Sequence, residues 1–153
     1  VREVFPESKS VNASILSYPV ITANFKYAHQ GSFINLIGHA PETQEEQDYF
    51  SCECQVDENT PPAFIWHTAE DTCVPVKNSL LYANALIEHK VPCELHIYPN
   101  GEHGAALAKE YVSYVNDPTI AGWLELAVTW IKRRFENPEE SDAPLNKAQY
   151  LKD

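Results

Sequence analysis

Residues 61–104 read PPAFIWHTAEDTCVPVKNSLLYANALIEHKVPCELHIYPNGEHG and contain three elements in order. The run AFIWHTA at 63–69 is apolar throughout, as in a strand buried on both faces of a sheet. From Val76 to near Lys90 the apolar residues recur at helical spacing, and Pro92 disfavours helix beyond that point. CELHIYP then alternates, which indicates another strand. This order predicts a parallel sheet with a crossover helix.

The predicted helix has an apolar stripe that we expect to be its buried side. Its positions are Val76, Leu80, Ala83 and Ile87, widened by Leu81, Ala85 and Leu86.

The segment before this block predicts a further strand and an insertion. VNASILSYPVI at 11–21 predicts a buried strand of about six residues that ends near Tyr18, because Pro19 interrupts it. Residues 22–62 show no clean period, so we interpret them as a cap-like insertion with one short helix near 42–50.

The segment after this block predicts two helices and a tail. Residues 105–114 are expected to be helical. AGWLELAVTWIKRRF follows with Trp123 and Trp130 at helical spacing and a basic last turn, which suits the helix dipole. Residues 137–153 are polar and proline-broken, which predicts a loosely held tail.

Together these elements predict an α/β fold with about three parallel strands, crossover helices and one domain over residues 1–136. Three strands make a poor sheet, and strands as apolar as 63–69 expect neighbours on both edges. We therefore expect the sheet to continue outside these residues. The sequence starts without methionine and contains none, which favours a portion of a longer chain.

Composition excludes several partners. The 153 residues are 44% hydrophobic, which suits one globular domain, and the net charge of −11 argues against nucleic acid or an anionic membrane surface. No apolar run approaches the roughly 20 residues of a membrane helix.

The four cysteines include one CxC pair, Cys52 and Cys54, without a CxxC or HxxxH set, so a zinc site is an alternative that we do not favour. We expect reduced thiols, a cytoplasmic location and no metal.

The candidate chemistry lies in two loops. Asp71 follows the strand at 63–69, and His103 lies in a glycine-flanked turn after the next strand. The carboxyl ends of parallel strands share one edge of a sheet, where ligands bind in open α/β folds. A carboxylate that accepts the Nδ1 proton of an imidazole leaves Nε2 as a base for a nucleophilic hydroxyl. The other reading of Asp71 is an acid at the start of the following helix.

Four other side chains receive structural interpretations. We expect His67 to pack or hydrogen-bond near the loop, His96 to pack against a helix, and Glu70 to be a solvated neighbour. Cys73 lies on the wrong strand for a nucleophile.

These residues resemble the C-terminal part of α/β-hydrolase fold esterases of the acetyl-esterase and lipase-like group. The matching frame is H-x-x-x-D-x-x-V-P, then V-P-x-E-L-H-x-Y, then G-x-H-G. In chain order its positions are His67, Asp71, Val74, Pro75, Val91, Pro92, Glu94, Leu95, His96, Tyr98, Gly101, His103 and Gly104.

The resemblance implies that Asp71 is the triad acid and His103 the triad base, with Pro19 and Val74 as pocket candidates. It also implies a nucleophilic serine in a G-x-S-x-G elbow. None of the five glycines forms that elbow with a serine. We therefore expect the nucleophile upstream, in an N-terminal half that belongs to the same chain or to a second one.

The predicted function is a serine hydrolase of small carboxylic esters, with acetylated sugars as candidate substrates and no cofactor. Prolyl-oligopeptidase-like and dienelactone-hydrolase-like enzymes share the acid and histidine frame and stay open. A degenerate, non-catalytic interaction module is the alternative from another class, since the elbow is missing. A homo-oligomer is also left open.

Overall fold

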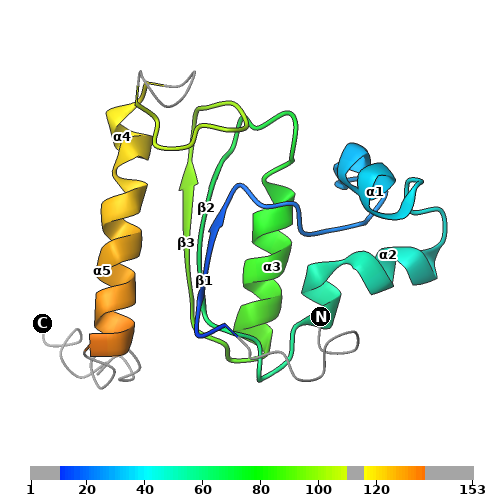
Figure 1. Ribbon diagram of the computed structural model, residues 1–153, viewed down its shortest axis with the longest axis horizontal. Coiled ribbons are helices and arrows are strands. Elements are labelled where there is room, and N and C mark those ends of the chain that lie inside the picture. Colours follow the sequence, from blue (N-terminus) through cyan, green and yellow to red (C-terminus); the bar gives the residue numbers. More distant parts are fainter. Residues whose placement is uncertain (1–10, 110–115, 137–153) are drawn as a thin grey trace, which may run out of the picture.

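The computed structural model describes residues 11–109 and 116–136. Its sheet has three strands in the order β1 (Ser14–Ser17), β2 (Ala63–Thr68) and β3 (Cys93–Tyr98), and both pairings are parallel. Because both pairings are parallel, the loops after β2 and β3 lie at one edge of the sheet, at the top of Figure 1. The predicted parallel sheet is confirmed.

Helices cover the two faces of the sheet. Helix α3 (Lys77–Glu88) packs on one face, and α5 (Trp123–Glu136), preceded by the short α4 (Pro118–Ala121), covers the other (Figure 1). All six residues of β2 are buried, as its apolar sequence predicts for a strand covered on both faces.

The two cores follow from alternation along β2. On the α5 side, Phe64 and Trp66 meet Trp123, Ala127 and Trp130, so the two tryptophans at helical spacing lie on the buried side of that helix. The other core lies on the α3 side, and its buried members are Val56, Ala63, Ile65, Ala83, Ala85, Leu86 and Val91.

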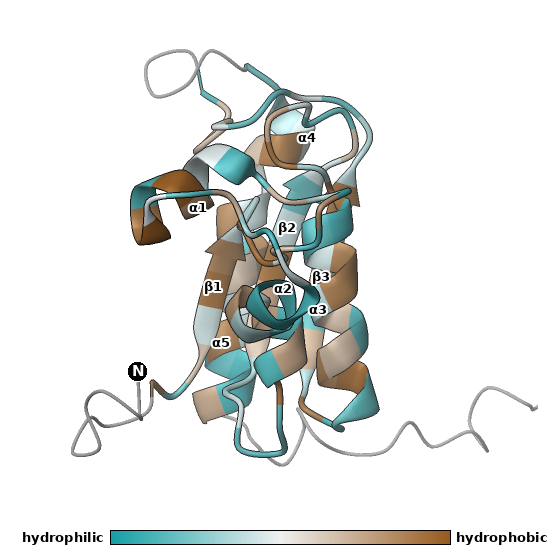
Figure 2. Ribbon diagram, turned by 90° about the vertical axis from the view of Figure 1, so that its right-hand side faces the viewer, coloured by the Kyte–Doolittle hydropathy of each residue, from teal (hydrophilic) through white to brown (hydrophobic). Residues whose placement is uncertain are grey.

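The insertion between β1 and β2 lies beyond α3. It contains α1 (Gln30–Ile37), α2 (Gln44–Phe50) and the 3₁₀ turn η1 (Cys52–Gln55), all on the α3 side of the sheet in Figure 1. The short helix expected near 42–50 is confirmed as α2, which begins with a capping box between Thr43 and Glu46. Figure 2 shows α2 as mainly hydrophilic, whereas α1 carries apolar residues at the surface.

Two details of the sequence analysis are wrong. The described part of the helix expected at 105–114 consists of turns, since Gly104, Ala106 and Ala108 have positive φ angles of 84°, 46° and 48°, which interrupt a right-handed helix. Residues 110–114 lie outside the described part, as does the expected tail at 137–153.

The apolar stripe of α3 is also displaced. Leu80 and Ile87 are 41% and 65% exposed. Asn78 and Ser79 are fully buried instead, because their side chains hydrogen-bond to the insertion and to His67.

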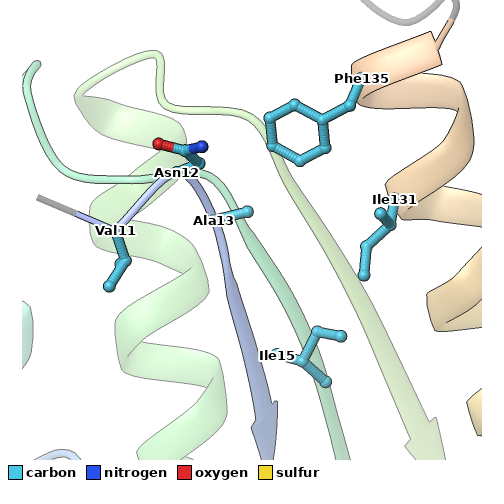
Figure 3. Close-up of a pocket in the computed structure, with 6 residues that line it drawn as sticks. All are labelled: Val11, Asn12, Ala13, Ile15, Ile131 and Phe135. Carbon is cyan, nitrogen blue, oxygen red and sulfur yellow. The ribbon is translucent and has the colours of Figure 1, made fainter.

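An open hollow lies at the opposite end of the sheet from the loops after β2 and β3. It has a volume of about 600 Å³ between the outer edge of β1 and the last turns of α5. Figure 3 shows Ala13 and Ile15 on the strand side, facing Ile131 and Phe135 on the helix. No helix of the described residues is long and apolar enough to cross a membrane.

Candidate active site

The loops after β2 and β3 bring Asp71 and His103 together. Nδ1 of His103 lies 2.8 Å from Oδ2 of Asp71, although 32 positions separate the two residues. The pairing of β2 and β3 extends into this region, because the amide of Ala69 donates to the carbonyl of Tyr98. The parallel register thus places the two loops side by side.

The carboxylate of Asp71 is fully buried and held in one orientation. Its Oδ1 accepts hydrogen bonds from the amides of Cys73 and Val74, at 2.9 and 2.8 Å. The loop therefore wraps around the acid. Asp71 does not cap the next helix, because α3 begins at Lys77, its N-cap residue is Val76, and its first turn has no acidic residue. The alternative reading as a helix-start acid is wrong.

The imidazole of His103 is one-third exposed. Since Asp71 can only accept, Nδ1 of His103 carries the proton in this pair. Within residues 11–109 and 116–136, the structure gives Nε2 of His103 no hydrogen-bond partner. This arrangement leaves Nε2 available to take a proton from another group.

The turn that carries His103 is tied to the Asp71 loop. The hydroxyl of Thr68 donates to the carbonyl of Gly101 at 2.7 Å, and the amide of Gly101 donates to Glu70 at 3.3 Å. Gly101 has a φ angle of 128°, where a side chain is strained, and a β-carbon there would lie 2.9 Å from Cγ2 of Thr68. Glu70 is exposed as expected, and it also helps to hold this turn.

An aromatic series supports His103 from the α5 side. Tyr18 packs edge-on against His103 and against Trp66, with ring centroids 4.8 and 5.0 Å apart. Trp66 stacks on Trp123, whose Nε1 donates to the carbonyl of Ala106, three residues after His103. The sequence analysis missed Tyr18 as a site residue; the only signal was its position at the end of a strand, before a proline.

His67 lies on the other side of Asp71 and is completely buried. Its Nε2 is 3.1 Å from Oδ2 of Asp71 and 2.9 Å from the carbonyl oxygen of Val74, and its Nδ1 is 2.7 Å from the hydroxyl of Ser79. Burial lowers the pKa of His67 below its ordinary value, against the opposing effects of the Val74 carbonyl and Asp71. The predicted role in packing and hydrogen bonding near the loop is confirmed.

The other candidates lie as follows. Val74 is 1% exposed and Pro19 is half-buried after Tyr18, and neither lines the hollow of Figure 3. Their role in substrate binding stays a prediction. His96 packs its ring near Phe64 of β2 and bonds to Glu94, and its packing against a helix stays a prediction. Among the described residues, no group of three or more histidines, cysteines and acids could hold a metal ion.

A parallel sheet with helices on both faces, and an acid and a histidine on the loops after neighbouring strands, define the C-terminal portion of an α/β-hydrolase. Residues 12–134 match the model of the prolyl oligopeptidase family, and the chain belongs to this family. The resemblance to α/β-hydrolases is confirmed, and the family is one that the sequence analysis kept as an alternative.

Known proteins similar to the chain include esterases and a xylanase. It is 50% identical to endo-1,4-beta-xylanase B of Butyrivibrio fibrisolvens over 109 residues, which cover 71% of this chain and 16% of the relative. It is 35% identical to an acetylxylan esterase of Xylanibacter ruminicola over 96 residues, 61% of this chain and 20% of the relative.

A solved structure of an acetyl ester-xyloside bifunctional hydrolase from Caldicellulosiruptor lactoaceticus superposes with a TM-score of 0.70 and 40% identity. It covers 79% of this chain and 42% of that protein. The chain therefore spans less than half of the solved relative and a fifth or less of the two curated ones.

Proposed function

We propose that this chain supplies the acid and the base of a serine carboxylic-ester hydrolase that acts on small, short-acyl esters, with acetylated sugars as the substrate class. The observation that carries the proposal is the pair of Asp71 and His103. The acid is buried and fixed by two amides, and the histidine binds it through Nδ1, while its Nε2 has no hydrogen-bond partner among the described residues.

The proposed mechanism moves one proton through His103. Its Nε2 takes the proton of a serine hydroxyl while the serine oxygen attacks the ester carbonyl, and Asp71 stabilises the resulting imidazolium. His103 then gives the proton to the leaving alcohol, and an acyl-serine remains. A water molecule, deprotonated by His103, releases the carboxylic acid and restores the serine.

The serine is proposed to come from outside these 153 residues, because no G-x-S-x-G stretch occurs in them. The free edge of the sheet supports this part of the proposal. β1 pairs only with β2 among the described strands, and the hollow beside it is lined by apolar side chains of Val11, Ile15, Ile131 and Phe135 (Figure 3). An unpaired edge beside apolar side chains can accept a further strand.

The names of two relatives support acetylated sugars as the substrate class. One is an acetylxylan esterase and the other an acetyl ester-xyloside bifunctional hydrolase, and each includes a stretch similar to this chain. A cytoplasmic location stays part of the proposal. Reduced thiols stay part of it as well.

The test begins with the intact mass of the protein purified from its natural source, which shows whether further sequence or a second chain accompanies residues 1–153. That complete protein is assayed with 4-nitrophenyl acetate and acetylated xylan. We expect hydrolysis in the wild type and roughly 10³-fold or greater loss of kcat in His103→Ala and Asp71→Asn. Folded variants that keep wild-type rates would refute the proposal.

A peptidase is the second candidate, because the matching family model is that of prolyl oligopeptidases. The same acid and base serve amide and ester hydrolysis. A proline-containing peptide 4-nitroanilide, assayed beside 4-nitrophenyl acetate, separates the two: a higher kcat/KM for the peptide would favour the peptidase.

A further inference from the structure

The carboxylate of Asp71 is shared by two histidines. Its Oδ2 lies 2.8 Å from Nδ1 of His103 and 3.1 Å from Nε2 of His67, while its Oδ1 accepts from the amides of Cys73 and Val74. A carboxylate has about four acceptor sites, and all four are used here. His67 therefore contacts the same oxygen as the proposed base.

The contacts of His67 determine which of its nitrogens carries the proton. Nε2 faces two groups that can only accept, the carboxylate of Asp71 and the carbonyl oxygen of Val74. A proton on Nε2 satisfies both, whereas a bare lone pair would repel both. Nδ1 then accepts from the hydroxyl of Ser79, 2.7 Å away in the first turns of α3.

The side chain of His67 is held in one orientation. Its ring is fully buried in β2, and Ser79 is fully buried in α3. His67, Asp71 and Val74 form a closed hydrogen-bond network, because the amide of Val74 donates to Asp71 while the carbonyl of Val74 accepts from His67. A rotation of the carboxylate would break these bonds together.

We propose that His67, fixed by Ser79, is a positioning residue for the Asp71–His103 pair: it donates its Nε2 proton to Oδ2 and holds that oxygen where His103 needs it. The inference rests on the proposed function for its catalytic consequence. The series Ser79, His67, Asp71, His103 links α3 to the exposed nitrogen of the base. The groups facing the imidazole of His103 within the described residues are Asp71 and the ring of Tyr18.

The first test is spectroscopic and needs no activity. Long-range ¹H–¹⁵N correlation spectra of the complete protein report the protonated nitrogen of each histidine at pH 7. We expect His67 to be neutral with its proton on Nε2, and His103 to show a hydrogen-bonded Nδ1 proton at low field. A proton on Nδ1 of His67 would overturn the proposal.

Two substitutions then separate positioning from packing. His67→Gln keeps an N–H donor near the position of Nε2, whereas His67→Leu removes the donor and keeps an apolar side chain. We expect the low-field proton of His103 to stay in place in H67Q and to move in H67L. Ser79→Ala should act in the same direction as H67L with a smaller effect, because it removes only the hydroxyl that fixes the ring.

The matched control is His96→Leu. His96 lies on the neighbouring strand β3, bonds to Glu94 and packs near Phe64, and within the described residues it forms no hydrogen bond or ion pair with Asp71. We expect this variant to leave the resonance of His103 unchanged. If H96L shifts that resonance as much as H67L does, the effect is a general one of packing and the proposal fails.

Kinetics of the complete protein give the catalytic consequence. H67L should lower kcat by roughly 10-fold or more with KM little changed. This loss should be smaller than the roughly 10⁴-fold loss of kcat that follows when a triad acid is neutralised. H67Q should recover most of the wild-type kcat. An unchanged kcat and resonance in H67L would overturn the inference. An inactive wild type would defeat the proposed function alone, because the spectra still decide the role of His67. If H67L does not fold, H67Q and the wild-type spectra decide it.

Discussion

The ring of Tyr18 packs edge-on against the imidazole of His103, with 4.8 Å between the centroids. Tyr18 reaches this position because β1 ends at Ser17 and the backbone of Tyr18 turns to a φ angle of 38°, which is rare for a residue with a side chain. Strained backbone that is kept beside a candidate base fits a role in holding it.

We predict that Tyr18→Ala lowers the free energy of unfolding by roughly 1–3 kcal/mol, because it removes two edge-on ring contacts, with His103 and Trp66. It should also lower ester hydrolysis by the complete protein. Tyr18→Phe is the control, since it keeps the ring and the same backbone strain. Urea unfolding measures the stability of the two variants, and 4-nitrophenyl acetate assays measure their hydrolysis rates. Equal stability and equal rates in Y18A and Y18F would show that the ring of Tyr18 does not support His103.

Asn78 joins α3 to the insertion. Its side-chain oxygen accepts from the amides of Ile21 and Thr22, each at 2.9 Å, and its amide donates to the carbonyls of Tyr27 and Pro75, each at 3.0 Å. The side chain is fully buried and uses every hydrogen-bonding group it has.

We predict that Asn78→Ala lowers the free energy of unfolding by about 3 kcal/mol or more, because it leaves several buried backbone groups without partners. Asn84→Ala is the matched control on the same helix, where the exposed Asn84 bonds only to Glu88 among the described residues; it should change stability by about 0.5 kcal/mol or less. Chemical unfolding measures both. Hydrogen exchange should accelerate at Ile21 and Thr22 in N78A alone.

Gly101 and Gly104 flank His103 and differ in their surroundings. Both have positive φ angles, 128° and 84°. A β-carbon on Gly101 would lie 2.9 Å from Thr68 and 3.1 Å from Ile120, whereas one on Gly104 meets nothing within 4 Å.

Alanine at Gly104 should therefore lower stability by about 1–2 kcal/mol, from backbone strain alone. Alanine at Gly101 should lower it by roughly 2–4 kcal/mol, because steric overlap adds to strain. G101A should also displace His103 and reduce hydrolysis more than G104A does. Thermal and urea unfolding with parallel assays check the ranking, and a larger effect at Gly104 would contradict it.

The sequence predicted the sheet because its strands are unambiguous. β2 is apolar at every position and β3 alternates, and their order with α3 leaves few topologies. The encounter of Asp71 with His103 followed from that topology, since both residues lie just after the carboxyl ends of parallel strands. Short α1 was missed because QGSFINLI was not distinguished from the irregular sequence around it.

The rest of the site depends on contacts that no local pattern encodes. Ser79 reaches His67 only because the first turns of α3 bury polar residues, which also explains why the expected stripe through Leu80 and Ile87 is exposed. Tyr18 reaches His103 because its own backbone has a positive φ angle, in the left-handed region. Both depend on how chain segments far apart in sequence come together.

The buried His67 makes stability depend on pH. Burial lowers the pKa of His67 in the folded protein, whereas in the unfolded chain it titrates near 6.5. A lowered pKa means that the unfolded state binds the proton more readily. The contribution of His67 to stability is therefore complete above pH 6.5 and is lost as the pH falls below that value.

We predict that the free energy of unfolding of the wild type falls more steeply than that of H67Q between pH 6.5 and pH 5, with a difference in slope of up to about 1.4 kcal/mol per pH unit. Urea unfolding of both proteins at several pH values gives this difference. H96Q is the control, because His96 is half-buried and bonds to a carboxylate; its curve should keep the steep fall of the wild type. Parallel curves for the wild type and H67Q would mean that His67 accepts a proton in the folded protein, which is incompatible with a neutral ring that donates to Asp71 and accepts from Ser79.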